Sequence, residues 1–69
     1  MNINTDTLKG NWKVLKGKVK EAWGELTDDE ITKVEGNYDV LVGEIQKKYG
    51  HTKEKAQESV NSFLKELNK

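Results

Sequence analysis

One stretch of fifteen residues occurs twice in this chain, and the duplication constrains the fold more than any other feature. When the sequence is shifted by 26 residues, 10–24 aligns with 36–50. Six aligned pairs are identical: Gly10/Gly36, Asn11/Asn37, Val14/Val40, Leu15/Leu41, Gly17/Gly43 and Gly24/Gly50. Because aromatic residues also align and a threonine follows each copy, we predict two helix–turn–helix units related by an approximate two-fold axis.

Apolar residues in both copies recur at steps of three and four, which is the spacing of an amphipathic helix. In the first copy the series is Leu8, Trp12, Leu15, Val19, Ala22 and Leu26. Proline is absent, and a chain of 69 residues has room for one small domain. We therefore predict an all-α fold, a four-helix bundle that forms one domain over 1–69, with helices over 6–24, 28–35, 37–49 and 53–67.

Local signals place the ends of these helices. Residues 27–30, with the sequence TDDE, form a capping box with an acidic first turn that suits the positive end of the helix dipole. We expect Gly24 to close the first helix in a left-handed conformation and Gly50 to end the third helix. Thr52 is expected to cap the fourth helix.

The predicted core is thin, because a chain of this length buries only about 60% of the surface that its unfolded form exposes. The residues expected to form it are Trp12, Leu15, Val19, Trp23, Ile31, Val34, Tyr38, Leu41, Ile45, Val60 and Phe63. Equivalent residues of the two copies should be buried together. Exposure of Leu41 with burial of Leu15 would contradict the duplication.

Glycines recur every seven residues, at 10, 17 and 24 and again at 36, 43 and 50. Gly17 and Gly43 lie inside predicted helices, where each glycine costs roughly 1 kcal/mol relative to alanine. Three explanations stay open: the glycines let two backbones approach closely, they keep the helices loose enough to melt and refold, or they are a relic of the duplication. We favour close packing for at least one of the pair.

The composition excludes several classes of function. Lysine supplies all twelve basic residues against twelve acidic ones, so no net charge draws the chain to nucleic acid or membrane. Cysteine and arginine are absent, which rules out disulfides, thiolate zinc sites and bidentate arginine contacts to phosphate. The mean hydropathy is −0.90, and no apolar run approaches the roughly 20 residues of a membrane span. We expect a soluble cytoplasmic monomer.

No group of residues in the sequence points to an enzyme, a cofactor or a metal. His51 is the single histidine and lies in a predicted turn, where a solvated side chain is the expected arrangement. The carboxylates of Asp28, Asp29 and Glu30 lack the spacing of a calcium loop. Phosphate-binding glycine loops and nucleophile elbows are also missing. We expect a protein that is not an enzyme, with no cofactor and no small-molecule substrate.

Lys9, Lys13, Lys16 and Lys20 lie within about 60° of one another on a helical wheel. This lysine stripe is the candidate binding surface, because a basic amphipathic helix can lie on a membrane or follow a phosphate backbone. The competing interpretation is that the lysine stems cover the flank of a small core while their ammonium groups stay in water. We favour the second interpretation, so binding to nucleic acid or to a membrane surface is the alternative function.

Several motifs of the chain resemble those of one known family. They are Asn11-Trp12-Lys13, Lys16-Gly17-Lys18-Val19-Lys20-Glu21, Trp23-Gly24, Leu26-Thr27-Asp28-Asp29, Glu35-Gly36, Leu41-Val42-Gly43 and Tyr49-Gly50. Over about 11–50 the chain is similar to the CsbD-like family, and its last helix matches loosely. The resemblance implies a small cytoplasmic bacterial protein, made abundantly in general stress, with four helices and no known catalytic, metal or ligand residues. We therefore expect a non-enzymatic stress-response protein that acts by abundance or by weak binding to a partner that the sequence does not identify.

Overall fold

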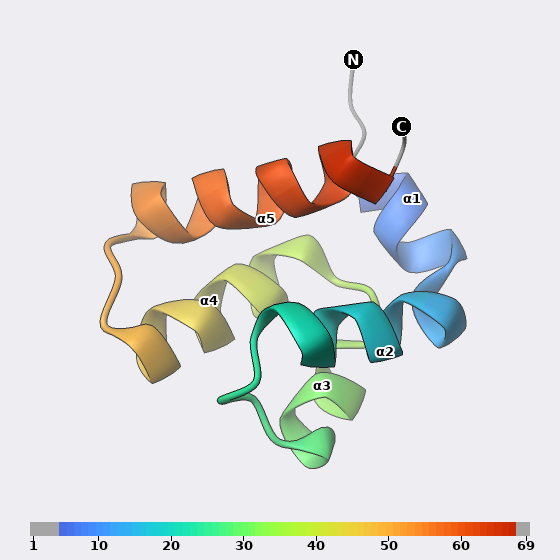
Figure 1. The fold of residues 1–69 in the computed structure, drawn as a ribbon, viewed down its shortest axis with the longest axis horizontal. Coiled ribbons are helices and arrows are strands. Elements are labelled where there is room, and N and C mark those ends of the chain that lie inside the picture. The colour runs from blue at the N-terminus through green and yellow to red at the C-terminus, as the bar shows by residue number, and fades with distance from the viewer. Residues whose placement is uncertain (1–4, 68–69) are drawn as a thin grey trace.

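The computed structural model describes residues 5–67, with side chains from Leu8 onward, and all regular secondary structure in this part of the chain is helical (Figure 1). The helices are α1 (Thr5–Gly10), α2 (Trp12–Ala22), α3 (Asp28–Val34), α4 (Tyr38–Tyr49) and α5 (Lys53–Leu67). The predicted all-α class is confirmed. Residues 1–4 and 68–69 of the predicted domain lie outside the described residues.

The prediction of one helix over 6–24 is wrong, because the chain forms two helices that separate at Asn11. The Asn11 carbonyl accepts hydrogen bonds from the amides of Val14 and Leu15 at 3.0 and 2.9 Å, so Asn11 is the residue that precedes the first turn of α2. Gly10 disfavours continuation of a helix, whereas the Asn11 side chain makes no capping hydrogen bond to α2. The break redirects α1 so that it packs against α4, and it gives five helices in place of four.

The end of α2 also differs from its prediction. The helix ends at Ala22, and Trp23 follows with φ −127° while its amide still donates to the Val19 carbonyl at 2.8 Å. Gly24 does not adopt the left-handed conformation expected of it. The Trp23 ring instead turns into the core, where its centroid lies 5.0 Å from that of Phe63 in α5. Tertiary packing of an aromatic ring therefore sets this helix end.

Three further helix ends follow their local signals. Thr27 Oγ1 accepts from the Glu30 amide at 3.2 Å, and Glu30 Oε1 accepts from the Thr27 amide at 2.9 Å, which forms the predicted capping box. Gly50 ends α4 in the left-handed conformation with φ 66°. Thr52 Oγ1 accepts from the Lys55 amide at 3.1 Å at the start of α5. These three predictions are confirmed.

The central element of the fold is α4, because α1, α3 and α5 all pack against it (Figure 1). α5 returns antiparallel along α4, and the Tyr38 hydroxyl donates to Asn61 Oδ1 at 3.0 Å between these two helices. α2 packs against α1 and α3. The radius of gyration of 10.8 Å agrees with the value of about 11 Å expected for a compact chain of this length.

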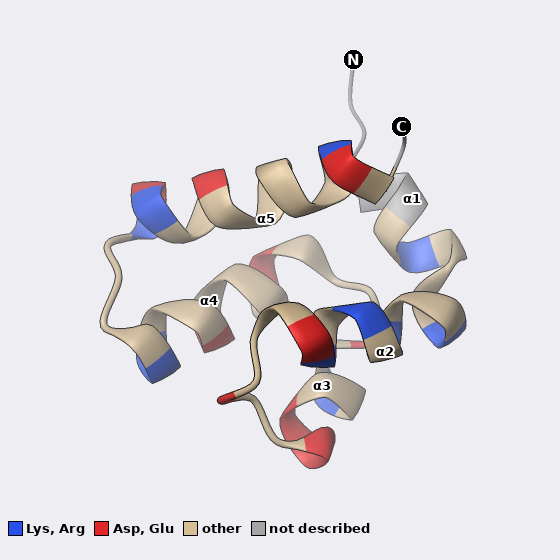
Figure 2. Ribbon diagram, viewed as in Figure 1, with Lys and Arg blue, Asp and Glu red and all other residues tan. Residues whose placement is uncertain are grey.

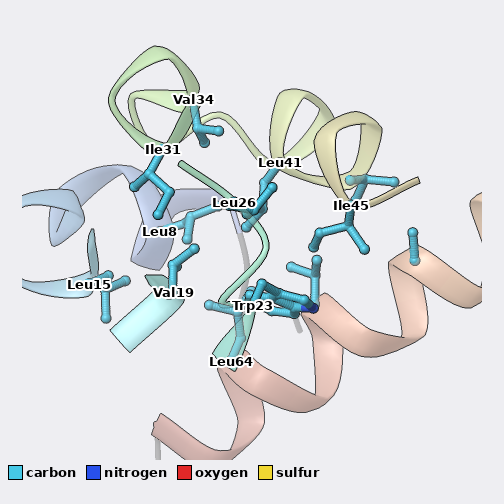
Figure 3. Close-up of a cluster of buried hydrophobic side chains, with 13 residues drawn as sticks. Leu8, Leu15, Val19, Trp23, Leu26, Ile31, Val34, Leu41, Ile45 and Leu64 are labelled. Carbon is cyan, nitrogen blue, oxygen red and sulfur yellow. The ribbon is translucent and has the colours of Figure 1, made fainter. Parts of the chain in front are cut away.

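Thirteen apolar side chains contributed by all five helices and the α2–α3 connection form the core (Figure 3). They are Leu8, Leu15, Val19, Trp23, Leu26, Ile31, Val34, Leu41, Val42, Ile45, Ala56, Val60 and Leu64. Three predicted core residues, Trp12, Tyr38 and Phe63, are instead half-buried and pack against this cluster. The aromatic rings therefore close the edges of the core while aliphatic side chains fill its centre.

Two pairs of equivalent valine and leucine residues in the two copies show matching burial. Leu15 and Leu41 are both buried, and Val14 and Val40 are both exposed, at 72% and 38%. The exposure pattern that would have contradicted the duplication is therefore not found at Leu41. The two-fold relation between the two units stays a prediction.

Candidate functional site

The four lysines of the predicted stripe lie on two helices (Figure 2). Lys9 belongs to α1, whereas Lys13, Lys16 and Lys20 belong to α2. The break at Asn11 therefore interrupts the continuous helix face that the sequence indicates. Lys9, Lys13 and Lys20 are exposed, and Lys16 is half-buried. Only the α2 part of the stripe keeps the predicted helical spacing.

Lys20 has a structural role at the connection between α2 and α3. Its Nζ donates to the Leu26 carbonyl at 2.9 Å and lies 3.6 Å from Asp28 Oδ1. Because both charged groups are substantially exposed, the ion pair contributes little to stability. The hydrogen bond satisfies a carbonyl that lies outside any helix, where a side-chain donor is needed. Lys20 therefore fastens the start of α3 to α2.

A depression of about 400 Å³ lies between α2 and α3. Its lining residues are Lys16, Gly17, Lys20, Asp28, Ile31 and Thr32. Two lysines of the predicted stripe thus lie beside a carboxylate and a hydroxyl group. No motif in the sequence indicates Thr32 or Ile31 as part of a site. The signal that could have identified them is the capping box at Thr27, which starts α3 after a short connection and folds it back against α2.

The two glycines inside α2 and α4 do not pack closely. A Cβ atom at Gly17 or Gly43 would meet no atom within 4 Å, so the predicted close approach is wrong for both. Close approach occurs instead at Gly36, which has φ 77°. A Cβ atom there would lie 2.7 Å from Lys9 Cα and 3.1 Å from the Leu8 carbonyl oxygen. Gly36 therefore lets α1 reach the connection between α3 and α4.

Glu30 joins the cap of α3 to α4. Lys48 Nζ lies 3.0 Å from Glu30 Oε2, while Oε1 accepts from the Thr27 amide. The amide hydrogen bond first, and then the Lys48 ammonium, lower the pKa of the Glu30 carboxyl from its ordinary value of 4.5. In the described part of the chain, no group of three or more histidine, cysteine or acidic residues is placed to hold a metal ion.

His51 lies in the turn between α4 and α5, where its ring stacks on that of Tyr49 with centroids 5.9 Å apart. The histidine is half-buried, so it is less solvated than the sequence indicates. The Tyr49 hydroxyl oxygen accepts from the Glu25 amide at 3.2 Å. This contact ties the α2–α3 connection to the end of α4, and the pairing of residues so distant in the sequence carries no local signal.

The fold and its surface define a small all-helical protein with interspersed charges of both signs (Figure 2). Over residues 5–67, none of the helices has the length and apolar character needed to cross a bilayer. The arrangement of its lysines, carboxylates and hydroxyl groups is suited to capping, ion pairing and contact with a small charged group.

The chain belongs to the CsbD-like family, whose sequence profile matches residues 6–58. It is 57% identical over 62 residues to a UPF0337 protein of Bordetella pertussis, and the match covers 90% of this chain and 94% of that protein. It is 55% identical over 58 residues to the UPF0337 protein YjbJ of Escherichia coli K12, with 84% of each chain covered. It is 46% identical over 65 residues to a UPF0337 protein of Pseudomonas aeruginosa, and that match covers 94% of this chain and 100% of that protein.

Proposed function

We propose that the protein is a non-enzymatic component of the bacterial stress response, and that a fold held close to its stability threshold is part of how it acts. It would work as a cytoplasmic monomer, by abundance or by weak binding. Membership of the CsbD-like family supports the assignment to stress response. The observation that carries the stability argument is that a Cβ atom at Gly17 or at Gly43 would meet no atom within 4 Å.

Each of these glycines weakens a helix without a compensating contact at its Cβ position. A glycine inside a helix costs roughly 0.5–1 kcal/mol relative to alanine. A domain of this length has a free energy of unfolding of about 3–10 kcal/mol in total. Two such glycines therefore remove an appreciable part of the stability that the same backbone can reach.

A fold near its threshold responds to small changes in its surroundings. Partial drying or osmotic stress alters the hydration of the chain, and a small change in free energy then shifts the folded fraction strongly. The hydrophilic composition, with charged residues at 35%, keeps the unfolded chain soluble. The protein can thus melt and refold as water becomes scarce and returns.

The experiment replaces both glycines by alanine and measures survival of stressed cells that carry the variant. Gly17→Ala with Gly43→Ala is expected to raise the thermal midpoint and to reduce survival. A compensated variant adds Ile45→Val, which deletes one core methyl group and costs about 0.5–1.5 kcal/mol. If the stability of the fold determines survival, cells with the compensated variant survive stress as well as cells with the parent protein. Unchanged survival of the stabilised variant, at equal protein level, would contradict the proposal.

The second candidate function is binding of nucleic acid or a membrane surface by Lys9, Lys13, Lys16 and Lys20. The observation that favours it is that Lys9, Lys13 and Lys16 form no ion pair with the described residues. Engagement of Lys20 by Leu26 and Asp28 reduces the charge available for such contacts. We therefore place this candidate second.

A further inference from the structure

The depression between α2 and α3 is open to solvent and lies where residues of both helices meet. Its volume of about 400 Å³ lies within the range of roughly 300–1,000 Å³ found for ligand pockets. Its lining combines an apolar residue, Ile31, with charged and hydroxyl groups from both helices. Most of the lining side chains are charged or polar, so a ligand here would be held by these groups.

The charges around this depression do not balance. Lys16 and Lys20 are four residues apart, so they lie next to each other on one face of α2. Among the described residues that line it, Asp28 is the only carboxylate, and it pairs with Lys20 at 3.6 Å. Lys16 is half-buried and has no ion pair among the described residues. Two ammonium groups against one carboxylate leave one positive charge for a ligand to neutralise.

Hydrogen-bond donors are available beside that charge. The Lys20 ammonium has three hydrogens, of which the Leu26 carbonyl takes one. Lys16 offers three more, and the exposed hydroxyl of Thr32 lies on the opposite wall. Ammonium and hydroxyl donors suit an acceptor that is itself ionised, because charge-assisted hydrogen bonds are stronger than neutral ones.

Gly17 leaves room in the same depression. It lines the depression, and the space at its Cβ position is empty to 4 Å. Gly43 occupies the equivalent position of the second copy, and a Cβ atom there would also meet no atom within 4 Å, but Gly43 is half-buried and does not line the depression. Reduced helix stability is therefore common to both glycines, whereas the open volume is particular to Gly17.

From these observations we propose that the depression between α2 and α3 binds a small molecule that carries one oxyanion group, a phosphate or a carboxylate. Lys16 and Lys20 supply the positive charge, Thr32 supplies a hydroxyl donor, and Gly17 supplies the space. The inference goes beyond the proposed function, because a fold of any stability can have such a site. Bound anion stabilises the native state, since the unfolded chain has no such arrangement.

The test is a titration of the isotope-labelled full chain with sodium phosphate and, separately, with sodium acetate, followed by amide chemical shifts. Sodium chloride at matched ionic strength is the control. Saturable shifts at amides of 16–20 and 28–32, with either oxyanion and not with chloride, are expected. Phosphate and acetate in separate arms show which oxyanion the site prefers. Shifts that grow linearly, or that chloride reproduces, would overturn the proposal.

Matched variants locate the site. Gly17→Gln places a neutral side chain in the depression, whereas Gly43→Gln makes the same change outside it, and both improve helix propensity. We expect Gly17→Gln to abolish the saturable shifts and Gly43→Gln to leave them intact. Lys16→Gln, which leaves the backbone unchanged, should weaken binding about tenfold, the effect of losing one charge-assisted hydrogen bond. Retention of full affinity in both Gly17→Gln and Lys16→Gln would reject the site.

The two proposals fail in different ways. Gly43→Ala alters helix stability without touching the depression, so its melting and survival data test the proposed function alone. The anion titration of the parent chain tests the site alone. A negative titration together with a positive survival result would remove the site and keep the stress function.

Discussion

The Lys48 ammonium lies 3.0 Å from the Glu30 carboxylate, so one ion pair joins the last turn of α4 to the residue that completes the cap of α3. The same carboxylate accepts the Thr27 amide through its other oxygen. One glutamate thus fixes both the start of a short helix and its position against the central helix.

This arrangement predicts a pH-dependent stability. The pKa of Glu30 is lower in the folded protein than its ordinary 4.5, so its contribution is present above 4.5 and is lost as the pH falls through the folded value. Glu30→Gln should therefore lower the thermal midpoint at neutral pH, and the difference should vanish in acid where Glu30 is protonated. Melts from neutral pH to well below 4.5 measure this. Glu25→Gln, a change of charge outside the cap, is the control; an equal effect of the two variants would contradict the assignment.

Lys20→Met tests the attachment of α3 to α2. The substitution keeps an apolar stem of similar length but leaves the Leu26 carbonyl without its donor. We expect the free energy of unfolding to fall by about 1 kcal/mol, as for the loss of a single hydrogen bond. Urea denaturation gives the value. Lys13→Met, at an exposed lysine of the same helix, should change stability by no more than about 0.5 kcal/mol.

Gly36→Ala is expected to be the most damaging glycine substitution. The left-handed backbone costs an alanine about 1–2 kcal/mol, and contact with the backbone of Lys9 adds about 1–3 kcal/mol. Gly50→Ala has the same backbone strain but meets no atom within 4 Å, so it should cost only the first amount. Equal losses in the two variants, measured by chemical denaturation, would show that α1 does not pack against Gly36.

A salt titration tests whether the lysine stripe binds nucleic acid or a membrane surface, which is the second candidate function. A fluorescent DNA duplex and anionic lipid vesicles serve as probes, each at salt concentrations from about 50 to 200 mM, the range over which phosphate contacts weaken steeply. Because the net charge is zero and the break at Asn11 divides the four lysines between two helices, we expect no measurable binding at the lowest salt. Saturable binding that weakens steeply with salt, and that Lys13→Gln reduces, would reverse the order of the two candidate functions.

Sequence signals confined to one turn of helix were sufficient to predict several helix ends. Thr27 with Glu30, Gly50 and Thr52 each act through groups within four residues, and each was predicted correctly. The break at Asn11 was missed although the duplication itself contained the signal. Its counterpart Asn37 follows a glycine and precedes α4, and the Asn37 side chain accepts from the Val40 amide at 3.1 Å. Asn11 makes no such capping bond, so the duplication indicates where the break lies but not its local geometry.

Less of the candidate site than of the fold could be predicted from the sequence. The lysines were identified by their spacing, but the partners that define their roles come from α3 and its preceding loop. Whether a neighbouring element packs against Gly17 depends on the tertiary fold. Helix propensity is a local property and does not predict such a contact. The end of α2 depends likewise on Trp23 meeting Phe63, a contact between residues 40 positions apart.

That aromatic contact gives the protein an optical signal of its own. Trp23 is buried against Phe63 of α5, whereas Trp12, the second tryptophan, is half-buried at the edge of the core. With Trp12→Phe as the background, emission from Trp23 reports whether the C-terminal helix is in place, since undocking of α5 exposes the indole to water. Undocking of this one helix can then be followed in the purified protein as the water activity of the solution is lowered, without an attached dye.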